Sequence, residues 1–189
     1  MKNFRKGASI AALFGAMVGG GPALAGEFIL TSPDVAEQRS VAETFVFNGF
    51  GCGGGNLSPA LQWHGAPPGT KSFAITAFDP DATSGSGWWH WVVYNVPITV
   101  DRLARGAGDP ARQLLPVGVV QGRTDFGAVG YGGPCPPKGS RPHHYVFTVY
   151  ALDIDVLPAR NGATAAMIGF TVHNHQLAEA KLTAIYGRY

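Results

Sequence analysis

Charged residues are scarce in this chain, and their scarcity excludes several classes of protein. Only 14% of the 189 residues are Asp, Glu, Lys or Arg, whereas 46% are apolar and 11% are aromatic. Disordered chains have the opposite composition, so we expect a folded domain with a substantial core. The basic residues are scattered along the chain, whereas nucleic-acid binding needs a basic stripe that neutralises phosphates. We therefore exclude nucleic acid as a partner.

The N-terminal apolar run is too short to span a bilayer, so we expect a protein that does not span the membrane. This run, residues 10–18, follows three basic residues and precedes the small residues of Ala23–Ala25. That order is typical of a secretory signal peptide. We predict cleavage after Ala25, a single domain over residues 26–189, and a periplasmic or secreted location. Fourteen basic residues less the three in the leader leave 11 against 12 acidic ones, a net charge of −1.

The sequence patterns of several enzyme classes are missing. The Gly-rich stretch 48–59 has neither the G-x-x-x-x-G-K-[ST] of a phosphate-binding loop nor the strand, G-x-G-x-x-G and helix of a dinucleotide site. We predict a tight structural loop there. The absence of G-x-S-x-G argues against a Ser-His-Asp hydrolase, and the absence of H-E-x-x-H argues against a zinc site. We expect no cofactor, no metal and no enzymatic activity.

Only two cysteines are present, Cys52 and Cys135, and each lies in a loop rich in Gly and Pro. An even number of cysteines in an exported protein favours one disulfide. The alternative is two unpaired core residues, since bonding requires Cα atoms within about 7 Å. We predict a Cys52–Cys135 disulfide.

Glycine and proline are abundant, with 27 and 14 residues spread along the chain. The spread indicates many turns and a β-rich domain. Residues 72–78 are apolar on alternate positions of both faces, with Phe73, Ile75 and Ala77 on one of them, so this strand should be covered on both sides. Other predicted elements are strands at 44–47, 91–96 and 145–151, a helical turn near Leu103, and helices at 163–168 and 174–185.

The loop between the two central strands holds two carboxylates and a histidine. Asp79 and Asp81 follow the strand at 72–78, and Pro80 with the Gly- and Ser-rich residues behind it favours a turn. Three tryptophans then flank His90. Polar groups beside aromatic surface at the mouth of core strands are typical of a small-ligand site.

A second loop, residues 122–144, brings two further histidines to the start of a strand. Groups from both loops could together hold one anionic head group such as a phosphate: His90, His143, the Tyr145 hydroxyl and the N–H groups of Gly132 and Gly133. We expect Asp79 to orient one of the imidazoles.

Other interpretations of these residues stay open. The same histidines with an aspartate could bind a transition metal, and His173 with His175 offers a second pair. Alternatively, His90 is a core histidine among the tryptophans. We interpret His64, His173 and His175 as surface or helix-packing residues.

Three motifs together resemble the phosphatidylethanolamine-binding proteins, in particular their bacterial Raf-kinase-inhibitor-like branch. The motifs are the sequence Asp-Pro-Asp-Ala from Asp79, Trp89-His90 before an apolar strand, and Gly-Pro-Cys-Pro-Pro-Lys-Gly leading to His143 and Tyr145. The likeness extends from Phe45 through the C-terminal end of the chain.

The resemblance implies a mainly β fold, an antiparallel sandwich of a large and a smaller sheet with short peripheral C-terminal helices. It also implies one small pocket for anions and phosphorylated head groups, lined by Asp79, His90, Gly133, Pro136, Pro137, His143 and Tyr145. Asp81 matches a motif position that is more often structural.

One residue departs from the family pattern, which usually has Arg where this chain has His144. The change replaces a permanent cation by one that depends on pH. Our leading hypothesis is an exported protein that binds a small anionic or phosphorylated ligand and modulates a protein partner. The alternatives are a slow hydrolase that uses His90 and Asp79 as acid–base groups, and an extracytoplasmic protease inhibitor whose exposed loop lies within residues 101–125.

Overall fold

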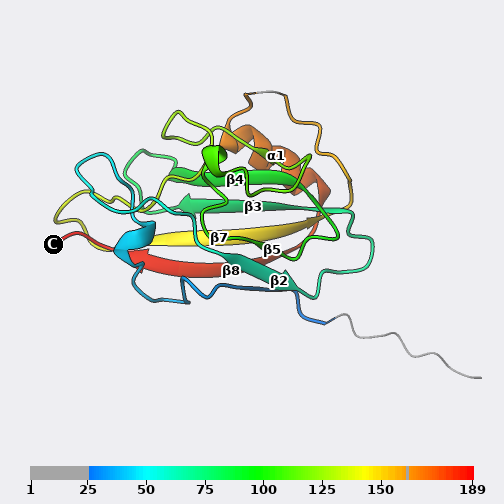
Figure 1. The fold of residues 1–189 in the computed structure, drawn as a ribbon, viewed down its shortest axis with the longest axis horizontal. Coiled ribbons are helices and arrows are strands. Elements are labelled where there is room, and N and C mark those ends of the chain that lie inside the picture. Colours follow the sequence, from blue (N-terminus) through cyan, green and yellow to red (C-terminus); the bar gives the residue numbers. More distant parts are fainter. Residues whose placement is uncertain (1–25, 161) are drawn as a thin grey trace, which may run out of the picture.

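Two antiparallel sheets form the framework of the molecule (Figure 1). The computed structural model describes residues 26–160 and 162–189, and the predicted signal peptide, residues 1–25, lies outside them. The larger sheet has the strand order β6-β4-β3-β7-β8, and the smaller has the order β1-β2-β5. The strands are β1 (Ile29–Thr31), β2 (Leu61–His64), β3 (Ser72–Asp79), β4 (Trp88–Pro97), β5 (Arg102–Leu103), β6 (Val120–Gln121), β7 (His143–Leu152) and β8 (Gln176–Tyr186).

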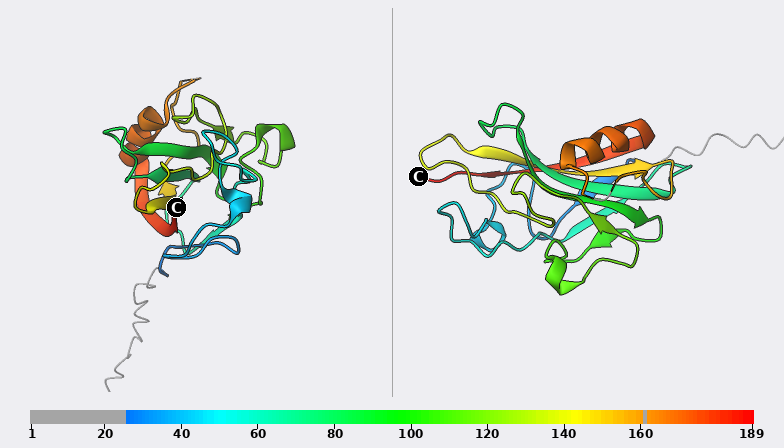
Figure 2. Two further views of the ribbon diagram at one scale, coloured as in Figure 1. Left: turned by 90° about the vertical axis from the view of Figure 1, so that its left-hand side faces the viewer. Right: turned by 90° about the horizontal axis from the view of Figure 1, so that it is seen from above.

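Both faces of the large sheet are covered, as the apolar alternation in β3 predicts. Phe73, Ile75 and Ala77 belong to the core cluster between the two sheets. Ala74 belongs to a second cluster, where the helix α1 (Ala165–His175) packs on the opposite face. The right-hand view of Figure 2 shows α1 on one side of the large sheet and the smaller sheet with its loops on the other. The predicted sandwich architecture is confirmed.

The C-terminal region differs from the prediction. Residues 176–186 form β8 rather than a helix, and they pair with β7 from His143↔Tyr186 to Leu152↔Gln176. Ala, Glu, Lys and Leu favour helices in isolation, but pairing with a long strand rich in β-branched and aromatic residues outweighs a weak local preference. The helix of this region, α1, extends from Ala165 to His175 and so continues past the short helix predicted at 163–168. Thr164 caps its start by accepting a hydrogen bond from Met167 N–H.

Two shorter predictions are also wrong. The predicted strand at 44–47 starts in a 3-10 turn, η1 (Glu43–Phe45), and Val46 then bonds to Asn56 of the Gly-rich loop instead of joining a sheet. The segment near Leu103 is β5, which pairs with β2. The helical turn expected there forms later, as η2 (Pro110–Arg112), where the Asp109 side chain caps it. Within residues 26–160 and 162–189, no helix has the length and apolar character needed to cross a bilayer.

Candidate functional site

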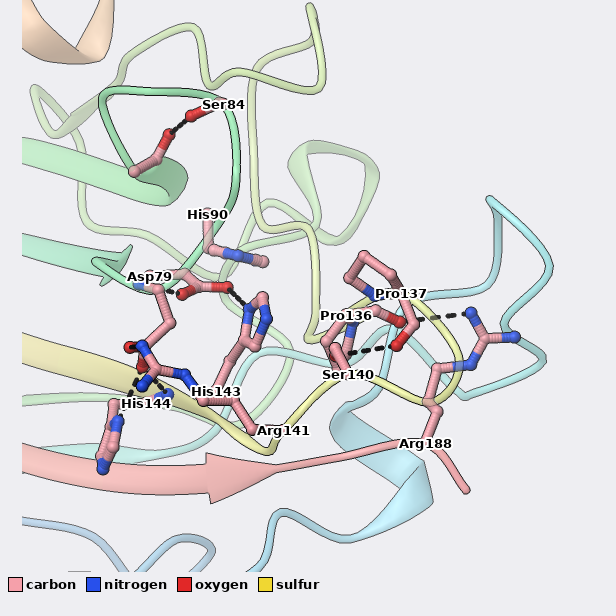
Figure 3. Close-up of polar contacts among 12 residues, drawn as sticks. Asp79, Ser84, His90, Pro136, Pro137, Ser140, Arg141, His143, His144 and Arg188 are labelled. Atoms are coloured by element: carbon pink, nitrogen blue, oxygen red, sulfur yellow. Dashed lines mark hydrogen bonds and ion pairs between the residues drawn. The ribbon is translucent and has the colours of Figure 1, made fainter.

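A cavity of about 290 Å³ opens at one end of the large sheet, where β3 ends and its neighbours β4 and β7 begin. Its size is close to the lower end of ordinary small-ligand sites, which start at about 300 Å³. Because adjacent strands are antiparallel, Asp79 at the end of β3 pairs with Trp88 at the start of β4, and Phe78 pairs with Val146 near the start of β7. The polar residues at this junction are Asp79, His90, His143 and Tyr145. Figure 3 shows the first three.

Asp79 orients His143. The two side chains are almost fully buried, and Nδ1 of His143 lies 2.7 Å from Oδ2 of Asp79. The other carboxylate oxygen of Asp79 accepts a hydrogen bond from Asp81 N–H at 2.8 Å. An ionised carboxylate can only accept, so the proton of this contact resides on Nδ1 of His143. The second ring nitrogen, Nε2, therefore remains for the cavity, and the expectation that Asp79 orients an imidazole applies to His143.

His90 reaches the cavity through an irregularity in β4. Ala77 pairs with Trp91, but the next residue of β3, Phe78, pairs with Trp89, so β4 contains one extra residue at this point. Such a bulge re-aims the side chain of the extra residue. By simple alternation with Trp91, His90 would point toward α1. Instead it lies edge-on to Tyr145, with the ring centroids 5.1 Å apart.

His90 is held by a backbone carbonyl. Its Nδ1 lies 2.7 Å from the carbonyl oxygen of Gly132, which can only accept, so Nδ1 carries the proton and Nε2 is left for a ligand. Burial lowers the pKa of His90, although the Gly132 carbonyl and the Asp79 carboxylate act in the opposite direction. The unliganded His90 is therefore neutral at pH 7.

The Tyr145 hydroxyl is buried and has no hydrogen-bond partner among the described residues. Burial and then the nearby Asp79 carboxylate raise the pKa of this phenol far above its usual value, so it stays protonated and serves as a donor. A buried polar group without a partner is rare in native proteins. The hydroxyl belongs to the wall of the cavity, so it can donate to a molecule that enters there.

Aromatic and proline side chains form the rest of the wall. Phe126 stands 5.3 Å from His90 and 5.8 Å from Phe50, measured between ring centroids. Trp88 meets Phe126 edge-on at 5.5 Å. Another part of the wall consists of Cys135, Pro136 and Pro137.

The predicted disulfide is present. Cys52 is bonded to Cys135, and their Cα atoms are 6.0 Å apart. It joins the Gly-rich loop to the cavity wall, because Cys135 lines the cavity and Phe50 stands two residues before Cys52.

Six of the seven predicted pocket residues line the cavity, and Gly133 does not. Its N–H donates to the Asn56 side chain at 2.8 Å, and the N–H of Gly132 donates to the His90 carbonyl at 2.9 Å. The expectation that these N–H groups bind an anion is therefore wrong for this structure. A Cβ at Gly133 would come within 2.1 Å of the Phe45 carbonyl oxygen. Glycine is needed here for close packing of two loops.

His144 points away from the cavity, so it does not stand in for a cation in the ligand site. Its ring Nδ1 lies 2.7 Å from Asp81, and its backbone N–H donates to the same carboxylate oxygen at 2.9 Å. Arg141 adds an ion pair to the other oxygen at 2.8 Å. Asp81 has the structural role that its motif position implies, since it ties the β3–β4 loop to the start of β7.

The remaining histidines lie elsewhere. His173 bonds to the Gly169 carbonyl within α1, His175 pairs with Asp153, and His64 is exposed on β2. No group of three or more His, Cys, Asp or Glu is placed to hold a metal ion in the part of the chain that the structure describes.

Several cavity residues are absent from the prediction: Phe50, Ala82, Thr83, Ser84 and Phe126. All lie in loops, where periodicity says nothing about direction. The sequence contains a signal for Ser84, because it lies in the loop between Asp81 and His90. Its hydroxyl donates to the Gly87 carbonyl within that loop. Phe50 and Phe126 lack such a signal, since tertiary packing alone brings them together.

Comparison with known proteins identifies relatives over almost the whole described chain. The family model for phosphatidylethanolamine-binding proteins matches residues 31–187. YbcL of Escherichia coli K12 is 48% identical over 164 residues, which cover 87% of this chain and 90% of YbcL. YbhB of the same organism is 50% identical over 157 residues, which cover 83% of this chain and 98% of YbhB.

Solved structures agree with the sequence comparison. The crystal structure of E. coli YbcL matches with a TM-score of 0.84 at 48% identity, over 86% of this chain and 99% of that one. A phosphatidylethanolamine-binding protein homologue from Chlamydia trachomatis matches with a TM-score of 0.71 at 31% identity, over 86% of this chain and 98% of that one. The chain therefore belongs to the phosphatidylethanolamine-binding protein family.

Proposed function

We propose that this protein binds a small oxyanion, a phosphate or a phosphorylated head group, in the cavity between His90 and His143, and that binding is coupled to proton uptake. The observation that carries the proposal is the convergence of three unused polar atoms. Nε2 of His90, Nε2 of His143 and the Tyr145 hydroxyl belong to one cavity, while the other ring nitrogen of each histidine bonds to the protein.

The protonation of these groups determines what they can bind. A neutral His90 offers only a lone pair at Nε2, whereas its protonated form donates from both nitrogens. An anion at Nε2 favours the protonated form and so raises the pKa of His90 from its depressed value. A singly protonated phosphate can in addition donate its own P–OH to Nε2 of His143. The site thus suits oxyanions that exchange protons with it.

The sign of the pH dependence follows from linkage. When the bound-state pKa exceeds the free-state pKa, affinity is highest below the free value, falls as pH rises between the two, and levels off above the bound value. Calorimetry with phosphoethanolamine and inorganic phosphate from pH 5 to 8.5, in two buffers of different ionisation enthalpy, measures both affinity and proton uptake. A flat affinity without proton uptake would contradict the proposal.

We propose that the site binds without turnover. A His–Asp pair can serve as a general base, so the His143–Asp79 contact is the observation that favours a hydrolase instead. The only serine in the cavity wall, Ser84, has its hydroxyl engaged by Gly87. Incubation with phosphate and carboxylate esters tests this alternative, since turnover that is lost in His143→Ala would favour the enzyme.

We also propose that the protein is exported and modulates a protein partner, as its sequence predicts. Protein purified from its native compartment should start at Gly26, which N-terminal sequencing determines. Native mass spectrometry of the same sample distinguishes a co-purifying small anion from a stoichiometric protein partner.

A further inference from the structure

One side of the cavity is built from two loops without regular structure of their own. Phe50 comes from the Gly-rich loop before β2, and Cys135, Pro136 and Pro137 come from the loop before β7. Neither loop is fixed by strand pairing at these residues. Two hydrogen bonds join the segments nearby, since Phe47 N–H donates to the Pro134 carbonyl at 3.1 Å and Gly133 N–H donates to the Asn56 side chain at 2.8 Å. At the cavity wall itself, the disulfide Cys52–Cys135 is a further link.

Arg188 supplies another link at the cavity wall, close to the disulfide. It lies two residues past the end of β8, and its guanidinium donates to the Gly51 carbonyl at 2.6 Å and to the Pro136 carbonyl at 3.3 Å. Its own backbone carbonyl accepts from Gly139 N–H at 2.8 Å. Figure 3 shows Pro136 and Pro137 between Arg188 and the two histidines. Arg188 does not line the cavity, so it has no contact with a ligand there.

The chemistry of the side chain suits this position. Guanidinium presents several donors in a planar fork, so one group can hold two carbonyls from different segments. A lysine ammonium at the same place is a single point charge on a flexible stem. Gly51 and Pro136 directly neighbour the cavity residues Phe50 and Cys135, so displacement of either carbonyl moves the wall.

We propose that Arg188 is a positioning residue for the ligand site: it sets the distance between the Phe50 loop and the Pro136–Pro137 wall, in parallel with the disulfide. This inference rests on the proposed oxyanion binding for its functional consequence. The disulfide and Arg188 join the same part of the two loops, so each compensates in part for the loss of the other. Loss of Arg188 therefore has a small effect while the disulfide is intact and a larger effect once it is gone.

The test uses Arg188→Ala and Arg188→Lys in the wild-type protein and in the Cys52→Ser/Cys135→Ser protein. Arg39→Ala is the matched control, because Arg39 is an exposed arginine whose side chain forms no hydrogen bond or ion pair with either loop. Hydrogen exchange of residues 48–55 and 134–140 without ligand reports only on how firmly Arg188 holds the two loops. Calorimetry with phosphoethanolamine at pH 6 reports on its consequence.

We expect faster exchange in both loops of Arg188→Ala and an affinity about fivefold weaker, with a larger loss in the background without the disulfide. Arg188→Lys should recover only part of the lost affinity. Arg39→Ala should lose no affinity. Unchanged hydrogen exchange of these loops in Arg188→Ala, in both backgrounds, would overturn the proposed positioning role of Arg188. Full recovery by lysine would also overturn it, because charge alone would then explain the effect.

The two proposals fail separately. If the wild-type protein binds neither phosphoethanolamine nor inorganic phosphate, the proposed function fails. Faster loop exchange in Arg188→Ala would still support the role of Arg188 in holding the two loops. If the wild-type protein binds and Arg188→Ala binds equally well in both backgrounds, the positioning role fails and the proposed function stands.

Discussion

At the scale of single residues, the Tyr145 hydroxyl connects the proposed ligand binding with the stability of the protein. It is a buried donor without a partner, and leaving such a group unpaired costs about 1–3 kcal/mol. The nearby Asp79 accepts from His143 and from Asp81 N–H. A ligand in the cavity that accepts from this hydroxyl would satisfy it.

Tyr145→Phe should consequently act in opposite directions on stability and on binding. We expect the free energy of unfolding of the unliganded protein to stay equal or rise by about 1 kcal/mol, because the unpaired hydroxyl is removed. Phosphoethanolamine affinity should fall about fivefold or more, the loss of one hydrogen bond. Urea denaturation and calorimetry measure the two effects. A destabilised protein that retains full affinity would show that the hydroxyl has no ligand role.

His90 makes the stability of the protein depend on pH. Burial lowers the pKa of His90 in the folded state, whereas the unfolded value is about 6.5. Below that value the unfolded chain binds more protons than the folded one. The contribution of His90 to stability is thus fully present above about pH 6.5 and is lost as pH falls toward the folded-state pKa.

His90→Asn isolates this contribution, because the asparagine amide can donate to the Gly132 carbonyl without titrating. We expect the melting temperature of the wild-type protein to fall more steeply than that of His90→Asn between pH 7.5 and 5. Added phosphate should stabilise the wild-type protein more at pH 5.5 than at pH 7.5, with little such difference in the variant. Parallel melting curves for the two proteins would contradict this assignment.

At the scale of structural elements, Asp81 connects the β3–β4 loop to β7. Burial opposes ionisation of Asp81, but hydrogen bonds from His144 and the charges of His144 and Arg141 outweigh it and hold the pKa below its usual value. Stability gained from this carboxylate is present above the unfolded-state value of about 3.9 and is lost as pH falls through the lower folded-state pKa.

Asp81→Asn should destabilise the protein by about 1 kcal/mol at pH 7, since Arg141 and His144 are exposed enough for solvent to screen the charges. The difference from the wild-type protein should shrink between pH 7 and pH 3, as pH falls below the unfolded-state value of about 3.9 toward the lower folded-state pKa of Asp81. Urea denaturation at the two pH values measures it. Phosphoethanolamine affinity provides the second readout, because residues 82–84 of this loop line the cavity.

At the scale of the whole molecule, the disulfide closes a large part of the chain. The bonded positions are 83 residues apart, and loop-closure entropy predicts about 4 kcal/mol of stabilisation for a loop of this length. The main core clusters lie within the sandwich and under α1. Cys52→Ser/Cys135→Ser should therefore fold, with a free energy of unfolding reduced by about that amount.

Urea denaturation of the two proteins, with thiol titration to confirm the oxidation state, tests this prediction. A loss below about 1 kcal/mol would indicate that the unfolded chain retains structure that keeps the two loops close. An unfolded double variant would mean that the loops are needed to complete the core.

The sequence by itself determined the features that depend on local pattern. The central strand β3 is apolar on both faces, so its coverage by a second sheet and a helix was predictable. The cysteine pair and the polar part of the candidate site were also predictable, because Asp79, His90 and His143 stand next to strand ends. The same patterns could not separate a helix from a strand at residues 176–186, where spacings of two and of three to four both fit.

Only the tertiary structure decided which groups meet. The bulge that turns His90 into the cavity results from the pairing of β4 with β3. The choice of His143 rather than His90 as the partner of Asp79 depends on β7 lying beside β3. Gly133 is taken up by contacts with Phe45 and Asn56, which are distant in sequence. Each outcome depends on contacts between segments far apart in the chain, and a local pattern holds no information about such contacts.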